Sequence, residues 1–209
     1  MKIKVCGMRE PENIREIADL KPDYMGFIFY SLSKRYAGEM DPAIADKIPP
    51  EINKTGVFVD ADLNEILRFV KKYKLDAVQL HGVEPADLCI ELKEQGLEVI
   101  KAFGIDSIFD FSVMKKYEGA ADHFLLDTKT SGHGGSGKTF DWELLKQYPY
   151  NTSYFLSGGL SNDNLKETEG IEDERLYALD LNSRFEISAA IKNVQEVKTA
   201  INYIRSKHK

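Results

Sequence analysis

Cys6 is the residue whose position in this sequence most directly suggests chemistry. It closes the short apolar run Ile3–Cys6 and is followed at once by Gly7, a residue type that commonly ends a strand. The spacing predicts a thiol where the first strand meets its loop, and there it could act as a base, act as a nucleophile or fill space. In barrels of alternating strands and helices, that end of each strand carries the chemistry.

A carboxylate stands at the equivalent place after a later strand. The strand-like run Phe124–Asp127 ends in Asp127, directly before the glycine-rich segment 128–139. The carboxylate could accept hydrogen bonds from loop amides, or it could serve as a general acid or base. Closure of a loop over Asp127 would exclude water and raise its pKa toward the range useful for proton donation.

The glycine-rich segment 128–139 raises an alternative from another functional class. It has four glycines among twelve residues, so we expect a mobile loop with a functional role. Within it, Gly132–Thr139 fits the P-loop pattern GxxxxGK[ST], which requires a strand directly before it and a long helix at its Lys-Thr pair. Four residues separate the strand-like run from this motif, and Pro149 follows soon after it. A nucleotide-binding protein is therefore the alternative and not the leading interpretation.

Several other segments after predicted strands could bind anions or line a pocket. Arg35 could be a solvated surface charge, but a guanidinium also binds carboxylates in a two-point geometry. Gly158 and Gly159 would let backbone amides approach a ligand closely. With the segment Asp180–Ser183 they occupy the places after strands seven and eight where such barrels bind phosphate. His81, just after the fourth strand, is expected to form part of the pocket wall.

The elements that would position these residues alternate between strand and helix. Apolar runs recur at intervals of roughly 20–30 residues, with helical patterns between them, including a last helix at Asn193–Ser206. The expected strands are Ile3–Cys6, Tyr24–Phe29, Thr55–Val59, Ala77–Leu80, Val99–Phe103, Phe124–Asp127, Tyr154–Ser157 and Tyr177–Leu181. Eight such units predict an α/β fold, a single (β/α)8 TIM barrel with a closed parallel sheet, as one domain over residues 1–209.

Composition limits the other possibilities. The chain has 209 residues, of which 43% are hydrophobic and 30% charged, and its net charge is −6. This balance is ordinary for a soluble domain and argues against a broad nucleic-acid surface. No apolar run approaches the ~18 residues of a membrane span, and the start of the chain lacks a signal-peptide pattern, so we expect no membrane partner. The low number of cysteines predicts a protein of the reducing cytoplasm.

Metal and cofactor motifs do not occur in the sequence. Its two cysteines, Cys6 and Cys89, are too few for a disulfide scaffold, and no cysteine and histidine cluster has zinc-site spacing. No GxGxxG follows a strand, and no GxSxG elbow occurs. We therefore expect neither a metal nor a nicotinamide cofactor.

Short motifs along the chain occur in an order typical of one enzyme family. They are Lys4–Met8, Gly26–Tyr30, Ser33–Tyr36, Gly56–Val59, Val78–Gly82, Ile100–Phe103, Leu126–Lys129, Gly134–Trp142 and Leu156–Leu160. Together they resemble phosphoribosylanthranilate isomerase, an enzyme of tryptophan biosynthesis, from the first strand to the last helix. The resemblance implies an Amadori rearrangement of N-(5-phosphoribosyl)anthranilate to 1-(2-carboxyphenylamino)-1-deoxyribulose 5-phosphate, without a cofactor.

The resemblance also implies roles for individual residues. It assigns the general base to Cys6, the general acid to Asp127 and carboxylate binding to Arg35. It assigns phosphate binding to Gly158, Gly159, Asp180 and Ser183. An ordinary thiol is only about a tenth ionised near neutral pH, so positive surroundings would be needed to raise the thiolate fraction of the base. The expected partner is a small phosphosugar, bound by a monomer or a homodimer.

One departure and two further alternatives accompany this resemblance. Many family members have Ser-Gly where this sequence has Ser183-Arg184, so Arg184 is a candidate for direct phosphate contact. Another phosphosugar isomerase or synthase is one alternative, although those barrels generally carry carboxylate pairs or a lysine at strand ends and this first strand ends in Cys6. A non-catalytic phosphate-binding barrel is the other.

Overall fold

A closed barrel of eight parallel strands forms the centre of the computed structural model, which describes residues 1–129 and 139–207. The strands pair in chain order, and β8 closes the barrel against β1. They are β1 (Lys2–Cys6), β2 (Tyr24–Ile28), β3 (Asn53–Phe58), β4 (Ala77–Leu80), β5 (Glu98–Ile105), β6 (His123–Thr128), β7 (Tyr154–Leu156) and β8 (Leu176–Leu181). The predicted fold is confirmed, and every strand boundary lies within two residues of its expected position.

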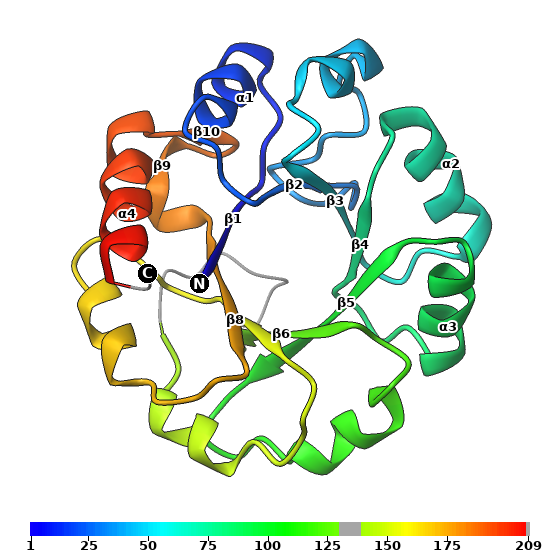
Figure 1. Ribbon diagram of the computed structural model, residues 1–209. Coiled ribbons are helices and arrows are strands. Elements are labelled where there is room, and N and C mark those ends of the chain that lie inside the picture. Colours follow the sequence, from blue (N-terminus) through cyan, green and yellow to red (C-terminus); the bar gives the residue numbers. More distant parts are fainter. Residues whose placement is uncertain (130–138, 208–209) are drawn as a thin grey trace.

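Helices surround the barrel as an outer ring (Figure 1). The α-helices are α1 (Pro11–Ala18), α2 (Leu63–Tyr73), α3 (Ala86–Glu94) and α4 (Val194–Lys207). Short 3₁₀ helices stand at the remaining positions: η1 (Pro42–Lys47), η2 (Phe111–Tyr117), η3 (Trp142–Gln147), η4 (Leu165–Gly170) and η5 (Ser183–Phe185). A small antiparallel pair, β9 (Glu186–Ser188) and β10 (Ile191–Lys192), follows β8 and is absent from the sequence-based expectation.

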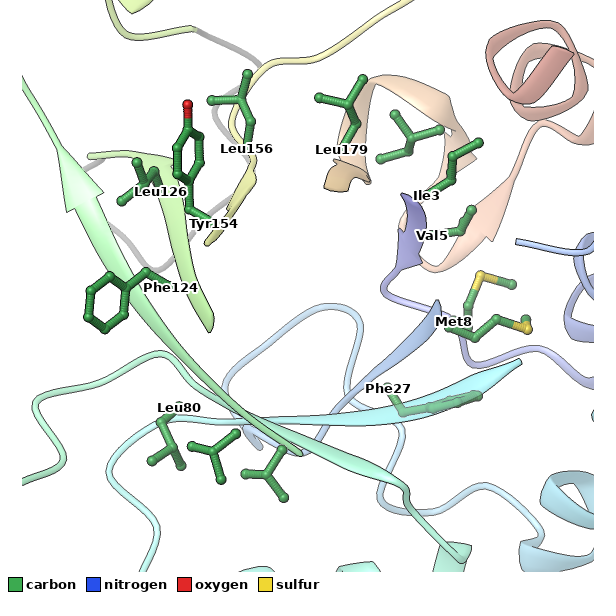
Figure 2. Close-up of a cluster of buried hydrophobic side chains, with 14 of the residues drawn as sticks. Ile3, Val5, Met8, Phe27, Leu80, Phe124, Leu126, Tyr154, Leu156 and Leu179 are labelled. Atoms are coloured by element: carbon green, nitrogen blue, oxygen red, sulfur yellow. The ribbon is translucent and has the colours of Figure 1, made fainter. Parts of the chain in front are cut away.

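The two-residue period of β1 separates its side chains into two environments. Ile3 and Val5 face outward into the large apolar cluster that packs the strands against the helices (Figure 2). Lys4 and Cys6 alternate with them and therefore face the barrel interior, where both are buried. Although β1 resembles a plain apolar run in the sequence, two of its polar side chains, Lys4 and Cys6, lie inside the barrel.

Apolar side chains fill part of the barrel interior. This smaller cluster consists of Tyr24, Ile100, Ala102, Leu125, Phe155 and Ala178. The interior is accordingly a packed core and not a pore, and a ligand can enter only at an end of the barrel. Within the described part of the chain, we find no helix with the length and apolar character needed to cross a membrane.

Candidate active site

A pocket opens at the carboxyl ends of the strands, and all the site residues predicted from the sequence line it. These residues are Cys6, Arg35, His81, Asp127, Gly158, Gly159, Asp180 and Ser183. They come from strands or loops spread over most of the chain, and the closed barrel alone brings them together. Further lining side chains include Gln79, Ser157 and Asn182, which the sequence-based reasoning did not select.

Cys6 is the last residue of β1, and its side chain is almost fully buried at 3% exposure. Burial has the largest effect and raises the pKa of the thiol, and the Asp180 carboxylate raises it further. The positive charges of Lys4 and Lys192 lower it. The net direction is upward, because burial outweighs the two ammonium groups. The expected positive surroundings are present, and Lys4 and Lys192 do favour the thiolate, although burial outweighs them.

Asp127 lies near the end of β6 and is also buried. Burial raises its pKa to about 6, the Asp180 carboxylate adds to the rise, and a hydrogen bond from the Thr128 N–H opposes it. That amide donates to Asp127 Oδ1 over 2.9 Å, so the carboxylate does accept a loop amide as one interpretation predicted. It also has a pKa close to the range useful for proton donation.

Lys4 stands behind the pocket wall and was missed in the sequence. Its side chain is fully buried, and its Nζ donates to Asp180 Oδ2 over 2.9 Å and to Gln79 Oε1 over 2.8 Å. Burial alone would lower the pKa of Lys4, but Asp180 and Cys6 outweigh it and raise the pKa, which keeps the ammonium charged. The Asp180 carboxylate is thus paired with a lysine, and phosphate binding by Asp180 stays a prediction. The sequence feature that could have identified Lys4 is its place two residues before Cys6 in the same strand, which puts both side chains on one face.

Arg35 is held by side chains from the unpredicted segment after β8. Its Nε and Nη2 donate to the two oxygens of Glu186, and Lys192 Nζ donates to Glu186 Oε1 over 2.7 Å. Burial disfavours the Glu186 carboxylate, but these hydrogen bonds and charges outweigh burial and hold its pKa below the usual range. Lys192 also donates to Asn182 Oδ1 over 2.8 Å. This network fixes the Arg35 guanidinium beside the pocket, and so Arg35 is not a freely solvated charge.

The backbone at Gly158 and Gly159 has the conformation expected of an anion-binding turn. Both residues have positive φ, at 89° and 69°, and a Cβ on Gly158 would lie 2.5 Å from the Thr128 nitrogen. Successive amides in such a turn can converge on one anion, with Ser183 beginning η5 nearby on the pocket wall. Arg184, by contrast, is exposed and does not line the pocket, so its contact with phosphate stays a prediction.

The described residues around the glycine-rich segment do not favour the P-loop alternative. Most of that motif, and most of the loop expected to be mobile, lies outside the described residues. The first helix after it, η3, begins only at Trp142, is a 3₁₀ helix and ends at Gln147. A P-loop requires a long helix that begins at its Lys-Thr pair. Within residues 1–129 and 139–207 no acidic, histidine and cysteine side chains gather into a group that could hold a metal ion.

Comparisons with known proteins agree with this geometry. The family model for N-(5'phosphoribosyl)anthranilate (PRA) isomerase matches residues 3–203. The chain is 42% identical to the N-(5'-phosphoribosyl)anthranilate isomerase of Parabacteroides distasonis, over 98% of this chain and 93% of the relative. The crystal structure of phosphoribosyl anthranilate isomerase from Thermotoga maritima superposes with a TM-score of 0.86 at 34% identity, over 99% of both chains.

A second solved structure carries a ligand. It is a phosphoribosyl anthranilate isomerase in complex with reduced 1-(o-carboxyphenylamino)-1-deoxyribulose 5-phosphate, similar to this chain with a TM-score of 0.81 at 31% identity over 99% of both chains. The family match covers nearly the whole sequence, and the resemblance inferred from the motifs is confirmed. The chain therefore belongs to the N-(5'-phosphoribosyl)anthranilate isomerase family.

Proposed function

We propose that this chain, acting as a single domain over residues 1–209, converts N-(5-phosphoribosyl)anthranilate to 1-(2-carboxyphenylamino)-1-deoxyribulose 5-phosphate. One observation carries the proposal: the Cys6 thiol and the Asp127 carboxyl, whose pKa is about 6, line the same pocket from strands β1 and β6. An aldose–ketose isomerisation needs an acid and a base at different atoms of one substrate. The relative crystallised with a reduced product analogue supports the substrate class.

Asp127 acts first, as the general acid. In its protonated form it donates a proton to the ring oxygen of the ribose, and the C1′–O bond breaks to give an open-chain Schiff base. The substrate nitrogen becomes the positively charged iminium, and Asp127 is left as a carboxylate. A pKa of about 6 keeps a usable fraction of Asp127 protonated near neutral pH, unlike an ordinary aspartate.

Cys6 acts second, as the general base. Its thiolate removes the proton from C2′, the electron pair flows toward the iminium nitrogen, and an enolamine forms. Tautomerisation of the enolamine gives the ketone, so the substrate nitrogen serves as the electron sink and no cofactor takes part. The ammonium groups of Lys4 and Lys192 favour the thiolate that this step requires.

Binding groups on the pocket wall would orient the substrate. Arg35 would bind the anthranilate carboxylate through the guanidinium donors that Glu186 does not occupy. The amides at Gly158 and Gly159, with Ser183, would bind the phosphate. Holding both ends of the substrate fixes C2′ and the ring oxygen relative to the thiol and the carboxyl.

A steady-state assay with freshly prepared phosphoribosylanthranilate tests this proposal. We expect turnover by the wild type and a loss of kcat of at least about 100-fold in both Cys6→Ser and Asp127→Asn. Full activity in either variant would remove that residue from its assigned role. Binding of the product analogue without turnover by the wild type would instead indicate a non-catalytic phosphate-binding barrel.

A further inference from the structure

A series of polar contacts runs through the barrel interior from β8 to β6, and all of its side chains except Lys4 line the pocket. Lys4 Nζ donates to Asp180 Oδ2 over 2.9 Å and to Gln79 Oε1 over 2.8 Å. Gln79 Nε2 lies 3.0 Å from His81 Nδ1, and His81 Nε2 lies 3.6 Å from Asp127 Oδ2. These contacts therefore connect the Lys4–Asp180 ion pair in the barrel interior with Asp127, the proposed general acid.

The chemistry of the donors and acceptors fixes which atom donates at each of these contacts. The Lys4 ammonium has only donors, so the Gln79 atom that faces it must be the amide oxygen. The NH2 end of the same amide then faces His81 and donates to Nδ1. An Nδ1 that accepts carries no proton, so a neutral His81 has its proton on Nε2, the atom that faces Asp127.

Burial keeps this arrangement in one orientation. The Gln79 side chain is 2% exposed and Lys4 is 0% exposed. Rotating the Gln79 amide by half a turn would set its NH2 against the Lys4 ammonium and its oxygen against an accepting Nδ1. Both contacts would be repulsive in a dry environment, where an unsatisfied polar group is costly.

We propose that Lys4 and Gln79 are positioning residues that fix the tautomer of His81, so that its Nε2–H points at Asp127. The inference rests on the proposed function, in which Asp127 gives up a proton and becomes negatively charged. An N–H aimed at Asp127 Oδ2 interacts more strongly as that charge develops, so it stabilises the transition state more than the bound substrate. The present separation of 3.6 Å exceeds a hydrogen bond, and we expect it to shorten as the charge grows.

The protonation of the His81 ring can be measured without substrate. In ¹⁵N NMR spectra of the wild type above neutral pH, we expect an unprotonated Nδ1 and a protonated Nε2. His81→Asn identifies these signals among the four histidines of the chain. A proton on Nδ1 of the wild-type enzyme overturns the inference, whatever the variants do.

Substitutions of Gln79 give the sharper contrast. In Gln79→Glu the side chain can only accept hydrogen bonds, so we expect a proton to appear on His81 Nδ1. In Gln79→Met both hydrogen bonds are lost while the volume is kept, so we expect the two His81 tautomers to mix, and Lys4→Met should have a similar effect. His123, at the other end of β6, should keep its signals in every variant and serves as an internal reference.

Kinetics then separates positioning from mere folding. For Gln79→Met we expect kcat to fall about 10- to 100-fold, as is typical when the partner of a functional group is removed, while KM stays within about threefold. Gln147→Met, a matched substitution at an exposed site on η3, should leave both unchanged. An unchanged kcat in a folded Gln79→Met variant overturns the inference even if the wild type turns over. If the wild type shows no turnover, the proposed function is wrong. The NMR spectra still determine which nitrogen of His81 carries the proton.

Discussion

The Arg35 guanidinium and the Glu186 carboxylate form a two-point ion pair, with Nε to Oε1 at 2.8 Å and Nη2 to Oε2 at 2.6 Å. The two residues are 151 positions apart, and Glu186 begins the short strand β9 that follows the barrel. The pair occupies one edge of the guanidinium and leaves the remaining N–H groups as donors for a ligand. Glu186 thus sets the direction from which Arg35 can receive a carboxylate.

Replacing Glu186 with glutamine should weaken substrate binding more than chemistry. The amide NH2 cannot accept from Arg35, so one of the two charge-assisted hydrogen bonds is lost and the guanidinium is free to rotate. We expect Glu186→Gln to raise KM about tenfold or more, with kcat within about threefold, in the isomerase assay. Glu12→Gln is the matched control, because Glu12 pairs with Arg15 on the exposed surface of α1. Equal KM values for the two variants would contradict a role for Glu186 in orienting Arg35.

Asp127 should make the fold less stable as the pH rises. Its pKa in the folded protein is about 6, above its ordinary value of 3.8, so the folded state holds this proton more tightly than the unfolded chain does. Stability is therefore lost as pH rises from about 4 through 6, by up to about 3 kcal/mol at neutral pH. We expect Asp127→Asn to raise the melting temperature near neutral pH and to change it little near pH 4.

The control for this measurement is the same substitution at a surface position. Asp163→Asn removes an exposed aspartate in the segment after β7 and should leave the pH dependence of unfolding as in the wild type. Denaturation by urea at several pH values gives the comparison directly. An Asp127→Asn variant less stable than wild type near neutral pH would show that burial does not dominate at this carboxylate.

Gly26 should be essential because it leaves space for the proposed base. A Cβ added at this position of β2 would lie 2.6 Å from Cys6 Sγ and 3.2 Å from the Cys6 Cα. The thiol would have to leave its position or the strands would have to separate. We expect Gly26→Ala to reduce kcat by at least about 100-fold, since misplacement of a catalytic group by about 1 Å has that effect. Gly170→Ala, where a Cβ meets no atom within 4 Å, should be active, and comparable activities would show that the thiol position is not critical.

The sequence predicts the barrel and the pocket lining well for a physical reason. Parallel strands buried on both faces are short apolar runs, and the residue that follows each run falls at the carboxyl end of the barrel. Cys6, Asp127 and His81 could all be placed in this way, without any knowledge of distances. The glycines at 158 and 159 were recognisable because paired glycines after a strand let backbone amides approach a ligand, and both have positive φ in the structure.

The contacts behind the pocket could not be predicted in the same way. Lys4, Glu186 and Lys192 are polar residues whose burial depends on partners from distant parts of the chain. A sequence pattern indicates which face of a strand a residue occupies, but it does not identify the residue opposite. The net direction of the Cys6 pKa shift could not be predicted for the same reason, because it depends on how burial compares with the charges around the thiol.

A polar cluster at the opposite end of the barrel should matter for stability and not for catalysis. Glu98, at the start of β5, accepts from the Tyr24 hydroxyl over 2.9 Å and from Asn53 Nδ2 over 2.8 Å, and His123 Nε2 lies 3.2 Å away. These contacts hold the amino-terminal ends of the strands together, at the end of the barrel opposite the pocket. Glu98→Ala leaves partly buried donors without their acceptor, so we expect a loss of about 2–3 kcal/mol of unfolding free energy in urea titrations.

The same variant should keep its catalytic parameters, because none of the residues around Glu98 lines the pocket. We expect kcat/KM within about threefold of wild type at a temperature where both proteins are folded. Glu94→Ala, an exposed substitution at the end of α3, controls for removal of a surface carboxylate and should change neither quantity. A Glu98→Ala enzyme with normal stability but reduced kcat would mean that the two ends of the barrel are coupled, and the division between a stabilising end and a catalytic end would then be wrong.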